Sequence, residues 1–341
     1  HIDEHTLEVI QKSSASTIIR VVALVVGFGI SIVLGHQLGP EGLGIISLVN
    51  RIIGLFLVFS LFGIAPVLIK EVSIGYQNKD FSHIGNSLYT AYLLNGGIAI
   101  SLVLIVLVSA NYISSNIFNS SELLIPLTIS IISIIPMLIS RINASALIGY
   151  RKIWQSNLVN QALSVFIVGL GILLMAILNI KLTVINVISL YAIGRVVVMI
   201  TTTVYWKSLN KFSRNKSFIG SKLLKTATPL FILSLSEVVI SSSDTIMLGW
   251  LTTTHEVGLY AVAARIALLT SFFLAVVNSA LAPKIAALYA VKKKAELERM
   301  VQKVTKGLIA LGLFIWIILA LFGKWILGIW GVEFKEAYVI L

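Results

Sequence analysis

Nine long runs of apolar residues, separated by short polar connections, dominate the pattern of this chain. Each run is about 20 residues or longer, the length that an α-helix needs to cross a hydrocarbon core roughly 30 Å thick. The apolar residues are nearly continuous within each run and do not alternate with polar ones, which excludes a barrel of short strands. The pattern therefore predicts an all-α polytopic membrane protein. The predicted spans are 17–38, 43–69, 86–110, 123–149, 158–178, 184–206, 226–251, 257–283 and 307–330.

The composition narrows the class of protein further. Of the 341 residues, 57% are hydrophobic and 12% are charged, with a mean hydropathy of +0.98, whereas soluble domains average about 45–50% apolar and about 25% charged residues. These values exclude a soluble enzyme and a disordered chain. The chain has no cysteine, which excludes disulfides and Cys-ligated metals. It also has no phosphate-binding glycine loop, catalytic triad order or zinc signature, so we expect neither enzymatic activity nor a cofactor or metal.

The basic residues are distributed unevenly between the two sides of the predicted membrane. Lys and Arg number 26 against 14 Asp and Glu, a net charge of +12. Eighteen of them fall on the side of the N-terminal segment, and only Lys181 and Lys335 fall on the other. Because basic loops remain in the cytoplasm, we expect a multi-pass protein of the cytoplasmic (inner) membrane with a cytoplasmic N terminus. Topology and contact with anionic phospholipids explain the charge, and we expect no nucleic-acid partner.

An internal repeat emerges when the chain is shifted by 214 residues against itself. The stretch 32–52, IVLGHQLGPEGLGIISLVNRI, aligns without gaps with 246–266, IMLGWLTTTHEVGLYAVAARI, and pairs Arg51 with Arg265. A shift of six spans preserves direction, which indicates two parallel six-helix lobes around a central cleft. The second lobe is incomplete, so we expect the chain to be part of a longer protein. The predicted parts are a cytoplasmic segment at 1–16 that forms a short surface helix, an N-lobe at 17–206, a basic loop at 207–225 and a partial C-lobe at 226–341.

Six basic side chains lie inside the predicted spans. A charge at the bilayer centre costs at least about 2.5–3.5 kcal/mol, so such residues usually face a polar interior and carry function. Near a helix end, a long side chain can instead reach the headgroups. Because a planar guanidinium can donate two parallel hydrogen bonds to a phosphate, the excess of arginine predicts an anionic cargo. The six residues are Arg20, Arg51, Arg141, Arg195, Arg265 and Lys324.

Two acids lie in the seventh predicted span. Glu237 and Asp244 are seven residues apart and therefore share one helix face. Such a face could bind a coupling cation or relay protons, or it could supply counter-charges for the arginines. Arg195 could also form an internal salt bridge with either acid. The sequence leaves these alternatives open.

Two pairs of segments carry a family resemblance. They are LGHQLGPEGLGIISLVNRI with LFGIAPVLIKEVS, and TPLFILSLSEVVISSSDTIMLGWLTTTHEVGLYAVAARI with SALAPKIAALYAVKKKAELERMVQKVTK. They resemble the lobe openings of the polysaccharide-transporter family of O-antigen flippase-like proteins, in the multidrug/oligosaccharidyl-lipid/polysaccharide exporter superfamily. The resemblance implies a cargo of undecaprenyl-pyrophosphate-linked oligosaccharide. It also implies that Arg20, Arg51 and Arg265 line the cavity, as arginines do in the lipid II branch, and that Asp244 is the Asp of a DxxxLG pattern.

The resulting hypothesis is a flippase that works by alternating access in surface polysaccharide biosynthesis. Arg51, Arg265, Arg20 and Arg141 would hold the pyrophosphate, while Asp244, Glu237 and Arg195 would couple an ion or supply counter-charge. The partners would be the lipid-linked oligosaccharide, the phospholipid bilayer, and a polysaccharide polymerase and glycosyltransferases. The alternative is a cation-coupled multidrug exporter of the same fold.

Overall fold

The computed structural model describes residues 4–209, 217–290 and 293–341, which are helical almost throughout and contain no strand. Seven helical segments within them are long and apolar enough to cross a membrane, and the first, Ile18–Leu61, covers nearly all of the first predicted span and most of the second. The predicted all-α membrane fold is therefore confirmed. The chain divides into residues 1–257 and residues 258–341, and each part is described by itself.

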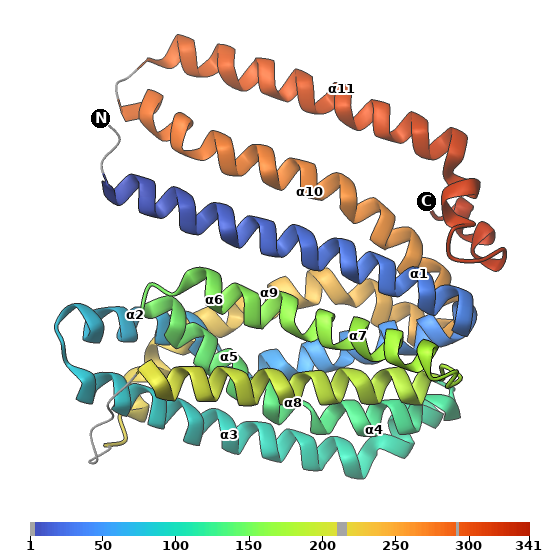
Figure 1. Ribbon diagram of the computed structural model, residues 1–341, viewed down its shortest axis with the longest axis horizontal. Coiled ribbons are helices and arrows are strands. Elements are labelled where there is room, and N and C mark those ends of the chain that lie inside the picture. The colour runs from blue at the N-terminus through green and yellow to red at the C-terminus, as the bar shows by residue number, and fades with distance from the viewer. Residues whose placement is uncertain (1–3, 210–216, 291–292) are drawn as a thin grey trace. The chain divides into compact units, whose positions relative to one another are not determined.

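Among its described residues, the first part holds nine complete α-helices, the start of α10 and three short segments of other helix types (Figure 1). The α-helices are α1 (Glu4–Leu61), α2 (Ile64–Gln77), α3 (Phe81–Tyr112), α4 (Leu124–Ile132), α5 (Ile134–Gly149), α6 (Ile153–Asn157), α7 (Ser164–Ile177), α8 (Val184–Leu209) and α9 (Gly220–Leu251). The other segments are the π-helical η1 (Ile113–Ile117) and η3 (Leu158–Leu163) and the 3-10 helix η2 (Ser121–Leu123).

Helix α1 consists of two spans joined by a sharp reversal. Gly39 has φ 65° and ψ −174°, a conformation that favours glycine, and Pro40 starts the second span with the fixed φ of a first helical turn. The ribbon doubles back at this point (Figure 1). From Glu4 onward the predicted surface helix at 1–16 is the continuous start of α1, while residues 1–3 lie outside the described residues.

A second break separates α1 from α2 within one predicted span. Phe62 (φ 41°) and Gly63 (φ 69°) are both left-handed, which interrupts the backbone hydrogen-bond ladder. The Asn95 side-chain amide of α3 donates to the carbonyls of Ser60 at 2.9 Å and Leu61 at 2.8 Å. Because an unsatisfied carbonyl is costly in an apolar bundle, Asn95 stabilises the break.

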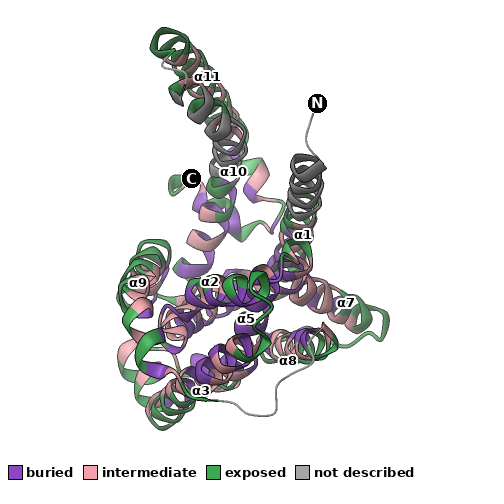
Figure 2. Cartoon of the chain, turned by 90° about the vertical axis from the view of Figure 1, so that its left-hand side faces the viewer, coloured by how far each residue is buried: buried purple, intermediate pink, exposed green. Residues whose placement is uncertain are grey.

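Helix α5 forms the centre of the first part. It packs against α2, α3 and α8, and buried residues cover most of its surface (Figure 2). Tyr92 of α3 donates to Asn143 of α5, whose amide donates to Thr203 of α8 at 3.0 Å. The core of the bundle is therefore tied together by polar side chains as well as by apolar packing.

Helix α9 packs along the second span of α1 and along α2. A Cβ on Gly249 would lie 2.7 Å from the Leu48 side chain, and one on Gly63 would lie 2.4 Å from the Ala227 carbonyl oxygen. The Phe62 and Phe231 rings stack at 4.6 Å between centroids. Helix α9 is thus in close contact with the middle of α1's second span and with the break that follows it, whereas the lobe boundary at 207–225 stays a prediction.

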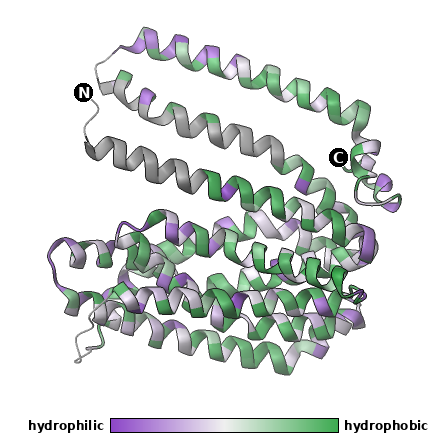
Figure 3. Ribbon diagram, in the orientation of Figure 1, coloured by the Kyte–Doolittle hydropathy of each residue, from purple (hydrophilic) through white to green (hydrophobic). Residues whose placement is uncertain are grey.

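The second part contains the rest of α10 (Thr254–Ala290), then α11 (Lys294–Leu327) and the 3-10 helix η4 (Glu333–Val339). The first half of α11 is hydrophilic and its second half is apolar (Figure 3). Lys324, one of the six intramembrane cations predicted from the sequence, lies 5.4 Å from the centroid of the Tyr338 ring. A cation–π contact therefore accompanies this lysine.

Candidate functional site

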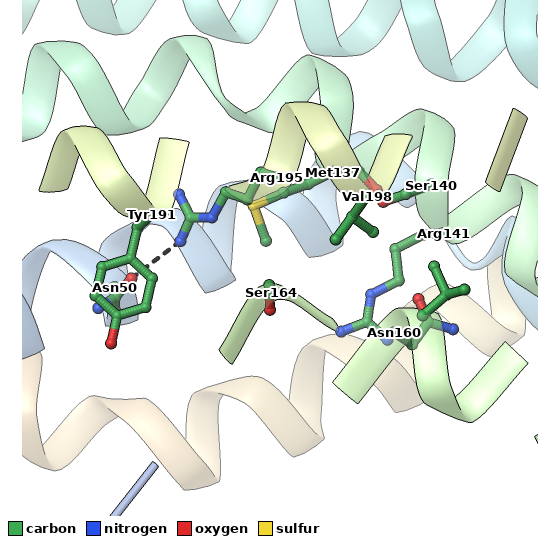
Figure 4. A pocket seen from close by; sticks show the side chains of 10 residues that line it. Asn50, Met137, Ser140, Arg141, Asn160, Ser164, Tyr191, Arg195 and Val198 are labelled. Carbon is green, nitrogen blue, oxygen red and sulfur yellow. Dashed lines mark hydrogen bonds between the residues drawn. The ribbon is translucent and has the colours of Figure 1, made fainter. Parts of the chain in front are cut away.

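A cavity of about 220 Å³ lies inside the first part of the chain (Figure 4). Its walls come from α1, α5, η3, the start of α7 and α8. Most of its lining side chains carry a polar group, although the surrounding helices are apolar. The lining residues are Asn50, Met137, Ser140, Arg141, Val159, Asn160, Ser164, Tyr191, Arg195 and Val198.

Arg195 of α8 is fixed in the cavity wall by two hydrogen bonds. Its guanidinium donates to the Ser133 hydroxyl at 2.5 Å and to the Asn50 side-chain oxygen at 3.0 Å. Ser133 lies at the break between α4 and α5, where Pro136 provides no N–H for the Ile132 carbonyl. Arg195 therefore connects α8 to α1 and to this break through neutral partners.

Arg141 of α5 lies in the same cavity but is held differently. Its side chain is exposed, and it has no hydrogen-bond partner among the residues that the structure describes. Its guanidinium lies beside Asn160 in Figure 4. Asn160 belongs to the π-helical turn η3, and π-turns within α-helices often occur at functional sites. Arg141 is thus free to donate its hydrogen bonds to a ligand.

The relative direction of the helices explains why these arginines meet. Contacts between α5 and α8 join Ser133 with Arg195 and Asn143 with Thr203, at sequence separations of 62 and 60 residues. A nearly constant separation means that the two helices run parallel. Arg141 lies eight residues, or about 12 Å of helix, beyond Ser133, and long side chains from both helices reach the same cavity.

The charge of the cavity is positive. Its ten lining residues include two arginines and no carboxylate. Two guanidiniums in a cavity surrounded by apolar helices repel each other more strongly than in water. A bound anion would offset this repulsion, and the side-chain amide of Asn160, which has two N–H donors, could add to its hydrogen bonding. The cavity is therefore suited to an anion with several oxygen atoms.

The other predicted residues lie apart from this cavity's lining. Arg20 is exposed on the first span of α1, and Arg51 is half-buried on the second span beside Asn50. On α9, Glu237 and Asp244 are both exposed, and an Asp244 oxygen accepts from the Thr245 N–H at 2.6 Å. Arg265 is exposed on α10, in the second part of the chain.

Sequence analysis missed the neutral members of the site. Asn50 and Asn160 each stand next to a second polar residue, Arg51 and Gln161, inside an apolar span, and Tyr191 lies in another such span; polar residues at these positions are the signal that could have identified them. Within the described residues no group of three His, Asp or Glu side chains could hold a metal ion.

Comparisons with known proteins identify relatives of this fold. A family model described as "Polysaccharide biosynthesis protein" matches residues 9–289. The solved structure of a multidrug resistance MATE family transporter of the MOP superfamily, in an inward-facing conformation, has a TM-score of 0.71 at 13% identity and covers 93% of this chain and 75% of its own. A second structure, named "protein A", has a TM-score of 0.60 at 15% identity, with 93% and 73% covered. No curated protein matches significantly. The fold is that of a membrane transporter.

Proposed function

We propose that this chain, which belongs to the polysaccharide biosynthesis protein family, is a flippase for undecaprenyl-pyrophosphate-linked oligosaccharide. It would act in the cytoplasmic membrane, with its N terminus in the cytoplasm, and supply surface polysaccharide assembly. A polysaccharide polymerase and glycosyltransferases would be its partners in that process. No enzymatic step is part of the proposal.

The observation that carries the proposal is the cavity with Arg141 and Arg195. The pyrophosphate is the only charged group that such a cargo must have, and it is the group least able to enter hydrocarbon unaided. Guanidinium is the side chain best matched to phosphate oxygens, and it keeps its charge in an apolar environment. Arg141 supplies unoccupied donors, while Arg195 adds positive charge from a fixed position.

The remaining predicted residues extend this proposal beyond the cavity. Arg51, Arg20 and Arg265 would contact the pyrophosphate at other stages of an alternating-access cycle. Asp244 and Glu237 would couple the cycle to an ion or balance the arginines. If transport moves a net charge, the membrane potential contributes about 2.3 kcal/mol per charge per 100 mV.

The alternative is a cation-coupled multidrug exporter. The similarity to the multidrug resistance MATE transporter in fold is the observation that favours it. Many drug cations, however, would be repelled by a cavity that contains two arginines and no carboxylate among its lining residues. The charge of the cavity therefore favours an anionic cargo over a cationic one.

The test replaces the two arginines in cells that depend on this chain for surface polysaccharide. Arg141→Gln and Arg195→Gln, alone and together, each remove a charged donor worth about 1.5–3 kcal/mol, so surface polysaccharide should fall roughly tenfold or more. Lipid-linked oligosaccharide should accumulate in the inner leaflet. Arg151→Gln, an exposed arginine after α5, is the matched control and should have no effect.

Normal surface polysaccharide in the double variant, at a normal protein level, would refute the flippase assignment. Loss of resistance to cationic drugs with unchanged polysaccharide would support the multidrug exporter instead.

A further inference from the structure

One carboxylate is buried among the described residues, and it lies outside the site described above. Glu71, on α2, is 5% exposed. It falls two residues beyond the predicted second span, 43–69, so hydropathy alone would place it in an exposed polar connection. A buried carboxylate requires compensating partners, and those partners come from two other helices.

The partners of Glu71 are one imidazole and one ammonium group. Its Oε2 atom lies 2.8 Å from Nε2 of His83, in the first turn of α3, and 3.6 Å from Nζ of Lys222, in the first turn of α9. We call these three residues the Glu71 cluster. Both contacts are made by the same carboxylate oxygen, so the charge of one partner directly affects the attraction of the other.

The Glu71 cluster lies where α9 begins. Two neutral hydrogen bonds also attach this segment to α3: the Ser217 N–H donates to Asn86 at 2.8 Å and the Ile219 N–H donates to Thr90 at 3.0 Å. The ion pair between Lys222 and Glu71 joins it to α2, in addition to the packing of α9 along α2. Of these contacts, only the ion pair depends on charge and hence on pH.

We propose that the Glu71 cluster is a proton-binding site that controls how firmly the start of α9 is attached to α2. With a neutral His83, the full negative charge of Glu71 attracts Lys222. When His83 binds a proton, its positive charge neutralises Glu71 at 2.8 Å and repels Lys222. A proton on His83 therefore weakens the attachment, and imidazole changes its charge between pH 5 and 8.

Other charged side chains on or next to α2, α3, α5 and α9 do not take the place of His83 and Lys222 beside Glu71. None of them forms an ion pair with Glu71 within 4 Å among the described residues. Asp80 accepts from the backbone N–H of His83 at 2.9 Å and holds the first turn of α3. The groups in question are Lys70, Lys79, Asp80, Arg151, Lys152 and Lys225.

The absence of cysteine in the chain makes a distance measurement simple. Spin labels on Gln77→Cys in α2 and Ser221→Cys in α9, both exposed positions, report the separation of the two helix ends in the full chain. Because Lys222 is 66% exposed, we expect the ratio of attached to detached molecules to fall by only about two- to fivefold from pH 8.5 to pH 5.5.

Three variants give the assay its specificity. His83→Gln should remain attached at both pH values, since its side chain cannot gain charge. Lys222→Gln removes the ion pair and should show, at both pH values, the distribution that the parent shows at pH 5.5. Lys225→Gln, an exposed lysine one turn later on α9, is the matched control and should respond to pH as the parent does. The proposal is wrong if the parent does not respond to pH, if His83→Gln still responds, or if Lys225→Gln abolishes the response.

Discussion

The two arginines of the cavity differ in how far the protein already satisfies their hydrogen bonding. Arg195 donates from two different nitrogens to Ser133 and Asn50, so its planar fork connects two elements at once. The Arg141 side chain has no hydrogen-bond partner among the described residues, although its backbone carbonyl accepts from Ser145. The two side chains therefore have separate roles: Arg195 stabilises the site, and Arg141 is available to a ligand.

Replacement of each arginine by lysine tests this difference. Arg195→Lys keeps the charge, but a single ammonium cannot match the geometry of the fork, so we expect a loss of about 1.5–3 kcal/mol in the free energy of unfolding. Arg141→Lys breaks no such contact and should stay within about 0.5 kcal/mol of the parent. Thermal unfolding of the purified proteins in one detergent measures both, and equal destabilisation would contradict the assignment.

The sequence predicts that these two arginines lie inside the membrane, but it does not predict that they line one cavity. Arg141 and Arg195 are both recognisable as charges inside apolar runs, yet their meeting depends on how α5 and α8 are rotated and packed, which hydropathy does not encode. The sequence predicts ion coupling or counter-charge for Arg195, which stays a prediction, and its hydrogen-bond partners in the structure are neutral. The burial of Glu71 could not be predicted from hydropathy, because the apolar run ends at residue 69 whereas the helices around α2 bury the chain beyond it.

At the scale of elements, the helix breaks are as informative as the helices. The break at Ser133 can be anticipated from Pro136, since proline removes a hydrogen bond one turn earlier. The break at Phe62–Gly63 has the same signal, since Pro66 provides no N–H for the Phe62 carbonyl, whereas the π-turn Leu158–Leu163 has none. Both also depend on tertiary partners, Asn95 in the first case, and a single sequence does not show which partners will be present.

Gly63 lies at the point where the α1–α2 break contacts α9. In Gly63→Ala, the new Cβ would lie 2.4 Å from the Ala227 carbonyl oxygen and 2.5 Å from the Phe231 nitrogen, backbone atoms that cannot move independently of α9. A left-handed φ costs alanine about 1–2 kcal/mol, and overpacking adds about 1–3 kcal/mol. We expect a clear drop in the melting temperature.

Gly54→Ala is the control for this prediction, because a Cβ there would meet no atom within 4 Å and alanine favours a helix by roughly 0.5–1 kcal/mol. If both variants melt together, α9 does not pack against the break as described.

At the scale of the whole molecule, the pattern of apolar runs and the family resemblance were sufficient to predict the fold class. The family match over residues 9–289 and the similarity to a MATE transporter confirm both. The repeat assigns α9 to a second lobe, which stays a prediction; in the structure α9 packs against α1 and α2. A sequence repeat records how segments correspond to each other, whereas contacts are set by the complementary surfaces of particular helices, such as Leu48 against Gly249.

The orientation of the chain in the membrane is the remaining prediction at this scale, and it rests on eighteen basic residues on one side against two on the other. The natural absence of cysteine allows single cysteines to report it. Gln77→Cys and Ser208→Cys lie on the basic side, and Ser121→Cys and Lys181→Cys lie on the other; all four positions are exposed. A maleimide that cannot cross membranes should label the last two in intact cells and the first two only after permeabilisation. Because basic loops are retained in the cytoplasm as the chain inserts, the reverse labelling pattern would overturn the predicted orientation and place the Glu71 cluster at the external end of the bundle.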